Sequence, residues 1–466
     1  MNKKYNVIIV GSGFSGIVAA NQFSGKGLSV LMIDENIHVG GQLLRSIPGE
    51  LGSNKSYKPD YIKKAGIRFI KGIENKDINI LNNSSVIGIY DKNEILVEIE
   101  KKEVKSFNFE AIIFATGARE RFLPFKGWTL PGIFSTGMSQ VLMKSSGILP
   151  AKNIVVAGSG LFLFSAAYEI LKNGGNVLSI HESTPMLEKI KLFPSLIHYF
   201  SKISEGMRYL SKIILSGVPL HHRSGIIEAR GGKYLEELVL GKKDKKGKFI
   251  TGKEKIVKTE ALAVGSGFTP NIELPYLAGC NISYSRSLGG WVVDVNDNME
   301  TSKKSLYCAG EPTGIGGALK SINEGETASF SILNKFGLIS NEEYNKKLRN
   351  LYRERKNHLQ FSHFFNTLYG IREEEILNIQ DETVICRCED VTMEEIRNSI
   401  DDGFTTPSAL KTSIRAGMGN CQGRTCGPII YDLLNSLNKA DSSETEPFTN
   451  RPPLKPVKID SLTNIK

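Results

Sequence analysis

Residues 5–36, YNVIIVGSGFSGIVAANQFSGKGLSVLMIDEN, constrain the fold more than any other segment. An apolar strand leads into Gly11, Gly13 and Gly16, which have GxGxxG spacing, and a helix and a second strand ending at Asp34 follow. In such a turn the first glycine permits the tight bend, the second lets the backbone approach a pyrophosphate, and the third lets helix and strand pack closely. The helix amino-terminus offers N–H groups to phosphates, and the terminal carboxylate can bind a ribose hydroxyl. The segment therefore predicts a dinucleotide-binding unit, with contacts from Gly11, Ser12, Gly13, Phe14, Ser15, Gly16, Asp34 and Glu35.

A second strand, glycine turn and helix occur in NIVVAGSGLFLFSAAYEILKNGGNVLSIHES. Gly158 and Gly160 stand in the first two glycine positions, but Leu163 takes the third, and His181 stands where the first unit has its terminal acid. Glu182 could replace that acid only after a one-residue shift, which would turn its side chain to the other face of the strand. This segment predicts a second α/β unit whose ligand stays open between NAD(P)H, an adenine nucleotide held structurally, and none.

The six cysteines are unevenly distributed, because none precedes Cys280 and four fall within residues 386–426. The first glycine turn therefore has no redox cysteine pair near it in sequence. The late four have CxC and CxxxxC spacing with no histidine between them. Four thiolates suit a [2Fe–2S] cluster or zinc, and in a reducing compartment they are more typical of a metal site than of disulfides. Cys280 and Cys308 are predicted to be buried apolar residues.

The length of 466 residues predicts two to four domains. The net charge is +10, and the densest basic stretch is residues 241–258. Its lysines do not alternate with a series of aromatic residues that could stack on bases, so we expect a solvated hairpin and no nucleic-acid partner. A strand starting near Tyr5 leaves no room for a targeting segment, and no apolar run of about 18 residues occurs. We expect a cytoplasmic protein without a transmembrane segment, and peripheral attachment at the inner face of the membrane stays open.

Two later segments resemble sequence marks of glutathione-reductase-like flavoproteins, which have paired dinucleotide-binding domains. They are AIIFATGARE, with Ala115, Thr116 and Gly117, and SLYCAGEPTGIGG, with Gly310, Glu311 and Gly317. The resemblance implies FAD at the first glycine turn and a flavin contact from Glu311, where the family more often has aspartate. Gly41 and Gln42, in GGQLLRS, are predicted to bring backbone and a side-chain amide close to the isoalloxazine.

Three longer segments resemble the α subunits of heteromeric flavin-dependent amine and amino-acid dehydrogenases, the group of opine oxidase, hydrogen cyanide synthase and dye-linked proline and hydroxyproline dehydrogenases. They are ATGARERFLPFKGWTLPGIFSTGMSQ, ILPAKNIVVAGSGLFLFSAAYEIL and LGGWVVDVNDNMETSKKSLYCAGEPTGIGGALKSINEG, and the likeness extends over residues 5–440. It implies that a substrate-oxidising β subunit, similar to D-amino-acid or sarcosine oxidases, removes hydride from a C–N bond and that this chain receives the electrons. Further expected partners are a quinone or other carrier and a small ferredoxin-like subunit. We find no general base, so no catalytic residue is predicted.

The segments ICRCED and GMGNCQGRTCGP resemble bacterioferritin-associated ferredoxin-like (BFD-like) domains. The resemblance implies a [2Fe–2S] cluster held by Cys386, Cys388, Cys421 and Cys426. Between these segments, Thr392 with Glu395 predicts a capping box, and Thr406-Pro407 predicts the start of the next helix.

The predicted fold class is α/β, a glutathione-reductase-like flavoprotein with two dinucleotide-binding domains and a small C-terminal helical iron–sulfur domain with four cysteine ligands. The predicted domains are residues 1–125 and 259–338 for the FAD unit, 126–258 for the second unit, 339–380 for a helical connector, 381–440 for the cluster domain and 441–466 for an extended tail. Our leading hypothesis is an electron-transferring subunit of an amine or amino-acid dehydrogenase. The alternatives are a self-sufficient NAD(P)H-dependent oxidoreductase and a C-terminal module that serves only for docking or sensing.

Overall fold

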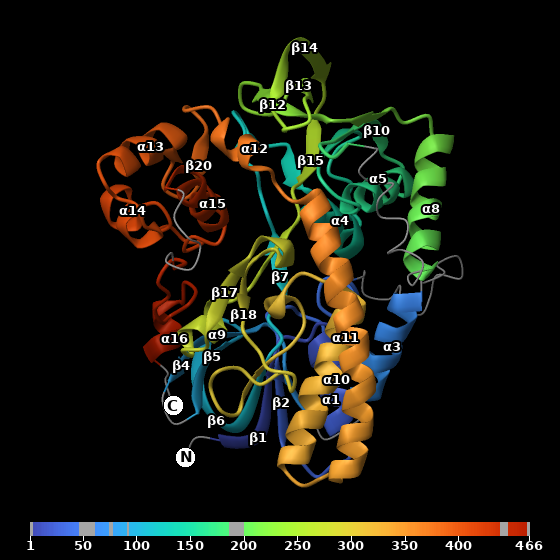
Figure 1. Ribbon diagram of the computed structural model, residues 1–466, viewed down its shortest axis with the longest axis vertical. Helices are drawn as coiled ribbons and strands as arrows, with labels where there is room; N and C mark the ends of the chain where they lie inside the picture. The colour runs from blue at the N-terminus through green and yellow to red at the C-terminus, as the bar shows by residue number, and fades with distance from the viewer. Residues whose placement is uncertain are drawn as a thin grey trace.

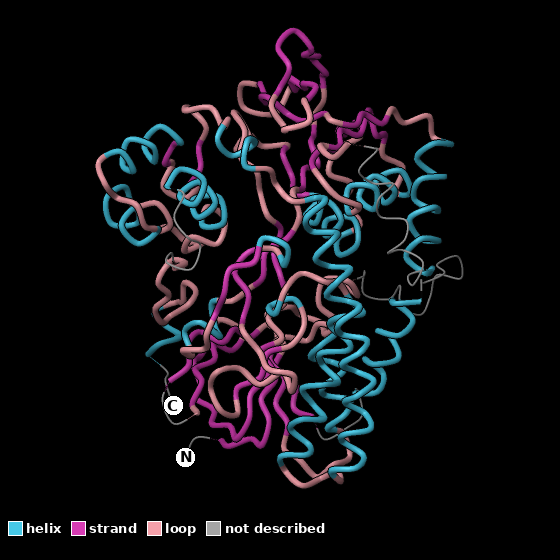
Figure 2. The backbone as a smooth tube through the Cα atoms, viewed as in Figure 1, coloured by secondary structure: helices cyan, strands magenta, loops and turns pink. Residues whose placement is uncertain are grey.

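The computed structural model describes residues 3–45, 61–73, 78–90, 93–185, 200–438 and 446–463. Two units that contain β-sheets lie one above the other in Figure 1, and a small helical unit lies beside them. Figure 2 shows strands in both larger units and long helices along one side of the lower one.

The first unit is built on a sheet with strand order β3-β2-β1-β6-β5-β4, and β19 also pairs with β6. Its strands are β1 (Lys3–Val10), β2 (Val30–Ile33), β3 (Ile78–Leu81), β4 (Ser84–Tyr90), β5 (Glu94–Ile99), β6 (Glu103–Phe114) and β19 (Leu306–Cys308), and its helices include α1 (Phe14–Phe23), α3 (Tyr61–Ile73), α9 (Glu273–Leu277) and α10 (Ala318–Lys335). Side chains alternate between the faces of a strand, so Val7 and Ile9 pack with α1 and α10 whereas Ile8 and Val10 pack into the core on the opposite face. The continuous apolar run of β1 follows from this burial on both faces.

The second unit has a five-stranded parallel sheet, β11-β10-β9-β15-β8, and a three-stranded antiparallel sheet, β12-β13-β14. Its elements are β8 (Ile133–Ser135), α4 (Thr136–Ser146), β9 (Asn153–Gly158), α5 (Phe162–Lys172), β10 (Asn176–Glu182), α8 (Phe200–Leu215), β11 (Leu220–His222), β12 (Ser224–Arg230), β13 (Glu237–Lys243), β14 (Phe249–Lys258) and β15 (Ala261–Gly265). The antiparallel pair β13 and β14 confirms the hairpin predicted for the basic stretch. Because the buried strand β15 completes the parallel sheet, we place the end of this unit after β15, beyond the predicted boundary at residue 258.

Two short antiparallel strands connect the units. β7 (Ala118–Glu120) follows β6 out of the first unit, and β16 (Phe268–Pro270) returns beside it to the hairpin of β17 (Ile282–Ser285) and β18 (Gly290–Val293). After α10, the long helix α11 (Asn341–Tyr369) runs from the first unit toward the second and is followed by α12 (Glu373–Leu377) (Figure 1). Among the residues described, no helix combines the length and apolar character needed to cross a membrane.

The C-terminal unit contains a hairpin and three helices, namely β20 (Val384–Cys386), β21 (Val391–Thr392), α13 (Met393–Asp401), α14 (Pro407–Ile414) and α15 (Gly427–Asn438). The predicted capping box is present, because the Thr392 hydroxyl accepts a hydrogen bond from the Glu395 N–H and the Glu395 carboxylate accepts one from the Thr392 N–H. Thr406 caps α14, and Pro407 is its first residue, as predicted. Residues 446–463 return to the first unit and end in α16 (Ile459–Thr463).

Candidate functional site

The first glycine turn joins β1 to α1 at the carboxyl end of the parallel strands. Gly11 has φ +106°, and a Cβ at this residue would lie 2.2 Å from the carbonyl oxygen of Ala115. A Cβ on Gly16 would lie 2.0 Å from the Gly11 oxygen. At Gly13, by contrast, no described atom lies within 4 Å of an added Cβ. Packing therefore requires the first and third glycines, whereas the second leaves room for a ligand.

Helix α1 presents its amino-terminus at this turn, and the described residues supply neither a side-chain cap nor an acidic residue in its first turn. Such a helix end attracts anions, because its N–H groups and the positive end of its dipole point outward. A second loop lies over the turn: the Gly40 N–H donates to the Ser12 carbonyl at 3.0 Å, and a Cβ on Gly41 would lie 2.8 Å from the Gly13 Cα. Gln42 follows this loop and is exposed. The arrangement fits the pyrophosphate of a dinucleotide.

The two carboxylates at the end of β2 differ in their surroundings. Asp34 is buried, and its Oδ2 accepts hydrogen bonds from the Ser12 N–H and hydroxyl, both at 2.6 Å. Its Oδ1 accepts from the N–H and the side-chain amide of Asn36, both at 2.7 Å. Asp34 therefore braces the glycine turn with both oxygens. The Glu35 side chain is 54% exposed and pairs with Lys455 of the C-terminal segment, so the geometry favours Glu35 as the carboxylate available to a ribose.

The two later flavin-type segments meet at this turn. Thr116 exchanges two hydrogen bonds with Asn271, at 2.7 and 2.8 Å, which fix the short segment of Ala115, Thr116 and Gly117 directly after β6. A Cβ on Gly310 would lie 2.7 Å from the Ser15 Oγ, so the returning segment packs directly against α1.

Glu311 follows Gly310 in the short 3-10 helix η3 (Glu311–Thr313). Its carboxylate accepts hydrogen bonds from the N–H groups of Gly316 at 3.2 Å and Gly317 at 2.7 Å, next to the start of α10. Burial raises the pKa of this carboxyl. The direct flavin contact of Glu311 stays a prediction.

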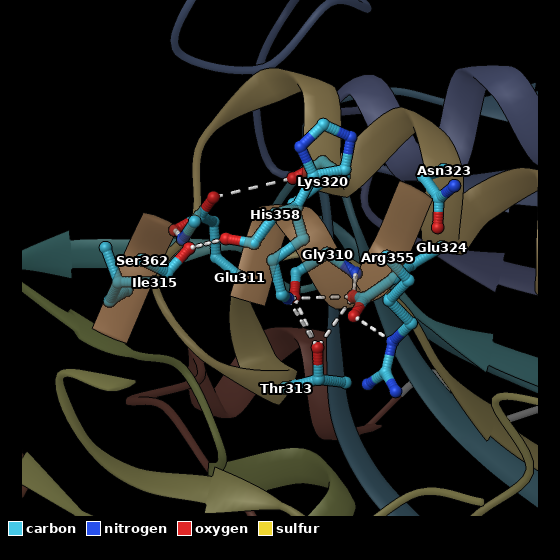
Figure 3. A network of polar contacts seen from close by, with 12 residues as sticks. Gly310, Glu311, Thr313, Ile315, Lys320, Asn323, Glu324, Arg355, His358 and Ser362 are labelled. Atoms are coloured by element: carbon cyan, nitrogen blue, oxygen red, sulfur yellow. Dashed lines mark hydrogen bonds and ion pairs between the residues drawn. The ribbon is translucent and has the colours of Figure 1, made fainter. Parts of the chain in front are cut away.

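A buried ion-pair network lies behind this segment (Figure 3). Lys320 and Glu324 on α10 are both 0% exposed and lie 2.9 Å apart. The Lys320 ammonium donates to the Gly310 carbonyl and the Thr313 hydroxyl, and Glu324 accepts from the Gly310 N–H at 2.9 Å. Arg355 of α11 donates to the other Glu324 oxygen at 2.8 Å. The network binds both the N–H and the carbonyl of Gly310. This network was not predicted from the sequence, although the Lys-x-x-x-Glu spacing of Lys320 and Glu324 was one signal of it.

Replacement of Lys320 by methionine is expected to lower the free energy of unfolding by about 3–5 kcal/mol, because it removes the ammonium that compensates a fully buried carboxylate. Urea unfolding followed by circular dichroism measures the change. Lys335→Met is the matched control, since Lys335 pairs with Glu300 at a site where both side chains are 25–30% exposed. The control should lose no more than about 1 kcal/mol. Equal losses in the two variants would contradict the stabilising role of the buried pair.

The chain itself covers the second glycine turn. This turn is as tight as the first, since a Cβ on Gly158 would lie 1.8 Å from the Gly265 carbonyl oxygen. The Ser159 hydroxyl donates to the Tyr369 carbonyl at 2.8 Å, and the Tyr369 Cβ lies 4.0 Å from the position of a Cβ on Gly160. The end of α11 therefore lies over the turn, where a nucleotide pyrophosphate would approach.

A cavity of about 90 Å³ lies beside this turn, between β13 and α12. Lys243 and Glu375 form a buried ion pair in its wall, and Lys243 also donates to the Ser183 hydroxyl at 3.1 Å. Pockets for drug-sized ligands usually measure about 300–1,000 Å³. The cavity is thus too small for a whole nicotinamide dinucleotide.

The predicted match of His181 to Asp34 is wrong, because a bulge between Val177 and Ser179 shifts the register of β10 by one residue. His181 pairs with Ala157 as Ile33 pairs with Val10, so Glu182, beside Gly158, lies where the first unit has Asp34. His181 is buried one residue before Glu182. Its Nδ1 lies 2.7 Å from the Ser224 Oγ and its Nε2 lies 2.9 Å from the Ser179 Oγ, and its ring stacks on His221. Burial, with a smaller effect of His221, lowers the pKa of His181 to about 3. His181 is therefore a buried, neutral imidazole, and the carboxylate that corresponds to Asp34 belongs to Glu182, whose Oε1 accepts a hydrogen bond from the Thr184 N–H at 2.9 Å.

The low pKa of His181 predicts a loss of stability in acid. The unfolded side chain takes up a proton near pH 6.5 and the folded one does not, so stability is unaffected above about pH 6.5 and falls below it. Between pH 7.5 and 5.5 the unfolding free energy should fall by about 1.4 kcal/mol more in the wild type than in His181→Gln. Urea unfolding at both pH values tests this, with the exposed His363→Gln as control. A His181→Gln protein that keeps the full wild-type pH dependence would refute this assignment.

The four late cysteines converge where β20 ends and α15 begins. The thiols of Cys386 and Cys426 are in hydrogen-bond contact, as are those of Cys388 and Cys421. The Cys426 thiol and backbone N–H groups, among them that of Gly417 at 3.5 Å, lower the pKa of Cys386 to about 6 against the opposing effect of burial. Within the described ranges, no group of three or more metal-binding side chains is arranged so that it could hold a single metal ion. Backbone N–H groups directed at sulfur, and a helix that starts directly after Cys426, fit an anionic iron–sulfur cluster.

The fold and the site define an FAD-dependent oxidoreductase with an appended iron–sulfur domain. The first unit has a glycine turn suited to bind a pyrophosphate, the second unit resembles a dinucleotide-binding domain, and the C-terminal unit brings four thiols together. The family model for pyridine nucleotide-disulphide oxidoreductases matches residues 5–328, and the model for the BFD-like [2Fe-2S] binding domain matches residues 384–436. The chain therefore belongs to the pyridine nucleotide-disulphide oxidoreductase family. The predicted fold class and the predicted FAD and [2Fe–2S] cofactors are confirmed.

Curated relatives share almost the whole length of the chain. The A subunit of opine oxidase from Rhizobium meliloti is 27% identical, over 99% of this chain and 88% of the relative. The HcnB subunit of hydrogen cyanide synthase from Pseudomonas aeruginosa is 28% identical, over 98% of each chain. Among solved structures, L-proline dehydrogenase from P. horikoshii shares the fold with a TM-score of 0.71 at 20% identity, over 99% of this chain and 80% of that one. These findings confirm the predicted resemblance.

Proposed function

We propose that this chain is the electron-transferring subunit of a heteromeric dehydrogenase that oxidises a C–N bond in an opine, proline-type or other amino-acid substrate. Its partner is a substrate-oxidising flavoprotein β subunit. The observation that carries the proposal is the combination, in one chain, of an FAD-type glycine turn without neighbouring cysteines and a four-thiol module. The subunit designations of the opine oxidase and hydrogen cyanide synthase relatives support the division of labour.

When bound, FAD supplies a two-electron centre and the [2Fe–2S] cluster a one-electron centre. The residues that would hold FAD are those of the Gly11–Gly16 turn, Glu35, the Gly41 loop and the segments after β6 and β19. Cys386, Cys388, Cys421 and Cys426 would hold the cluster. A quinone or another carrier, with or without a small ferredoxin-like subunit, would then receive the electrons.

The proposal is tested by co-expressing the chain with a candidate β subunit and measuring dye reduction with opines, proline and hydroxyproline. We expect substrate-dependent reduction of the dye and bleaching of flavin and cluster absorbance in the anaerobic complex. A complex that contains both cofactors but reduces dye with no secondary amine or amino acid would rule the proposal out.

The alternative, a self-sufficient NAD(P)H-dependent oxidoreductase, is disfavoured by the Tyr369 carbonyl on the second glycine turn. An adenine nucleotide held structurally in the second unit stays open. Anaerobic mixing of the holoprotein with NADH or NADPH distinguishes these cases, because only the alternative predicts rapid flavin bleaching.

A further inference from the structure

Arg119 links the end of the flavin-binding strand to the cysteine module. It lies on β7, two residues after Gly117, and its guanidinium has three partners. Its NH1 donates to the Asn271 Oδ1 at 2.7 Å, and its NH2 lies 2.6 Å from the Glu273 Oε1. Its Nε donates to the carbonyl of Arg424 at 3.1 Å, and this carbonyl belongs to the loop between the last two cysteines. One side chain therefore connects the two units that carry redox groups.

The same asparagine that binds Arg119 also holds the flavin-type segment. The Asn271 N–H donates to the Gly117 carbonyl at 3.0 Å, in addition to its two hydrogen bonds with Thr116. Movement of Arg119 would thus disturb both ends of the connection. A continuous hydrogen-bonded route runs from the end of β6 through Asn271 and Arg119 to the cysteine loop.

The charges around this link are mostly buried. Glu273 lies between Arg119 and Arg424, whose side chains are 24% and 20% exposed. Burial alone would raise the pKa of Glu273, but the two arginines outweigh it and hold the pKa below its ordinary value. Arg424 also donates to the carbonyls of Cys421 at 3.2 Å and Leu454 at 2.8 Å. Partly buried ion pairs are screened weakly by solvent and salt, so the contact between the flavin-binding unit and the cysteine loop should persist at ordinary ionic strength.

A second contact holds the helix that follows the cysteine loop. Arg121, also on the segment that leaves the flavin unit, pairs with Asp432 of α15, and both side chains are almost fully buried. Tyr284 of β17 donates its hydroxyl to the same Asp432, and its ring lies 4.4 Å from that of Tyr431. This contact anchors α15 independently, so the Arg119 link acts on the loop itself.

We propose that Arg119 is a positioning residue that fixes the loop of residues 417–427 against the flavin-binding strand, so that electrons pass from flavin to cluster within one chain. The inference rests on the proposed function. Each transfer moves one electron from reduced flavin to one ferric ion of the cluster, so full reoxidation of the flavin takes two transfers. The electron acceptor reoxidises the cluster between the two transfers. The flavin protons are released to water. A lysine at position 119 can pair with Glu273 but lacks the rigid fork that also reaches Asn271 and the Arg424 carbonyl.

The test compares holoprotein variants Arg119→Lys and Arg397→Lys. Arg397 is the matched control, because it pairs with Asp381 and binds two backbone carbonyls without leaving the C-terminal part of the chain. The readouts are hydrogen exchange of residues 417–427, the electron paramagnetic resonance spectrum of the cluster, and the rate of cluster bleaching after flash reduction of the flavin. In Arg119→Lys we expect both cofactors to be retained, exchange in the loop to rise about tenfold, and the transfer rate to fall about 10- to 100-fold.

Wild-type exchange and transfer in Arg119→Lys would overturn the inference, as would an equal effect of Arg397→Lys. If Arg119→Lys does not fold, Glu273→Gln provides the second variant, since it weakens the hold on Arg119 without changing side-chain size, and it should shift both readouts in the same direction. A wild-type protein whose cluster never receives flavin electrons would refute the proposed function, whereas the exchange comparison would still decide the positioning role.

Discussion

Replacement of Cys421 by serine is expected to abolish the cluster's visible absorbance and its paramagnetic signal while FAD is retained. Even changes outside the ligand shell of a metal site cost about 10- to 100-fold in metal affinity, so removal of a ligand should lower cluster occupancy at least that far. Electron transfer from the substrate-reduced complex to an external dye should fall in proportion to the cluster that is lost. Iron and sulfide content, flavin content and dye reduction measured on the same preparation test this result.

Cys280→Ala is the control for this experiment. Cys280 is buried in the core of the first unit, separate from the core of the cysteine module, and its Sγ lies 3.3 Å from the Thr301 Oγ1. The control should keep both cofactors. A Cys421→Ser complex that loses its cluster but reduces dye at the wild-type rate would support the alternative in which the C-terminal module serves only for docking or sensing.

Replacement of Gly13 by alanine is expected to weaken FAD binding about 10- to 100-fold in a protein that still folds. The position has φ −68° and open space, so a methyl group causes no strain within the chain, and loss of a glycine helix cap costs only about 1 kcal/mol. The methyl would occupy the space predicted for the pyrophosphate. Displacing a phosphate oxygen from one N–H removes a charged hydrogen bond worth about 1.5–3 kcal/mol, or roughly 10- to 100-fold in affinity. Flavin titration of the apoprotein measures the loss.

Gly16→Ala gives the contrasting outcome. Its methyl would lie 2.0 Å from a backbone oxygen, so this variant should lose folded protein as well as flavin. Circular dichroism and thermal unfolding separate the two cases. Unchanged flavin affinity in Gly13→Ala would place the dinucleotide elsewhere and overturn the assignment of this turn.

Local signals in the sequence predicted the helix starts and turns because short-range chemistry determines them. The Thr392–Glu395 capping box, the start of α14 at Pro407 and the hairpin in the basic stretch are all present. Each depends on residues within a few positions of one another, so no tertiary information was needed.

Positions that depend on partners far away in the chain were less predictable. The spacing placed Asp34 at the ribose-binding position, but both of its carboxylate oxygens accept hydrogen bonds from Ser12 and Asn36. Glu35 is therefore the carboxylate that the geometry favours for the ribose. The predicted boundary at residue 258 took no account of β15, which pairs with β9 in the sheet of the second unit. The partners of Arg119 lie on other elements, so its contacts could not be read from sequence. Lys320 pairs with Glu324 on its own helix, but its contacts with Gly310 and Thr313 depend on the returning segment.

The sequence by itself determined the class of protein: two glycine turns, flavin-type strand ends and a four-cysteine module require only local spacing. Tertiary structure decided what each site can do. It placed the end of α11 on the second glycine turn, where the Ser159 hydroxyl donates to the Tyr369 carbonyl. It also joined the flavin-binding strand to the cysteine loop through Arg119, across about 300 residues of sequence. Such contacts form only when buried charges and backbone groups from distant segments find partners in the folded chain, so no pattern along the sequence reveals them.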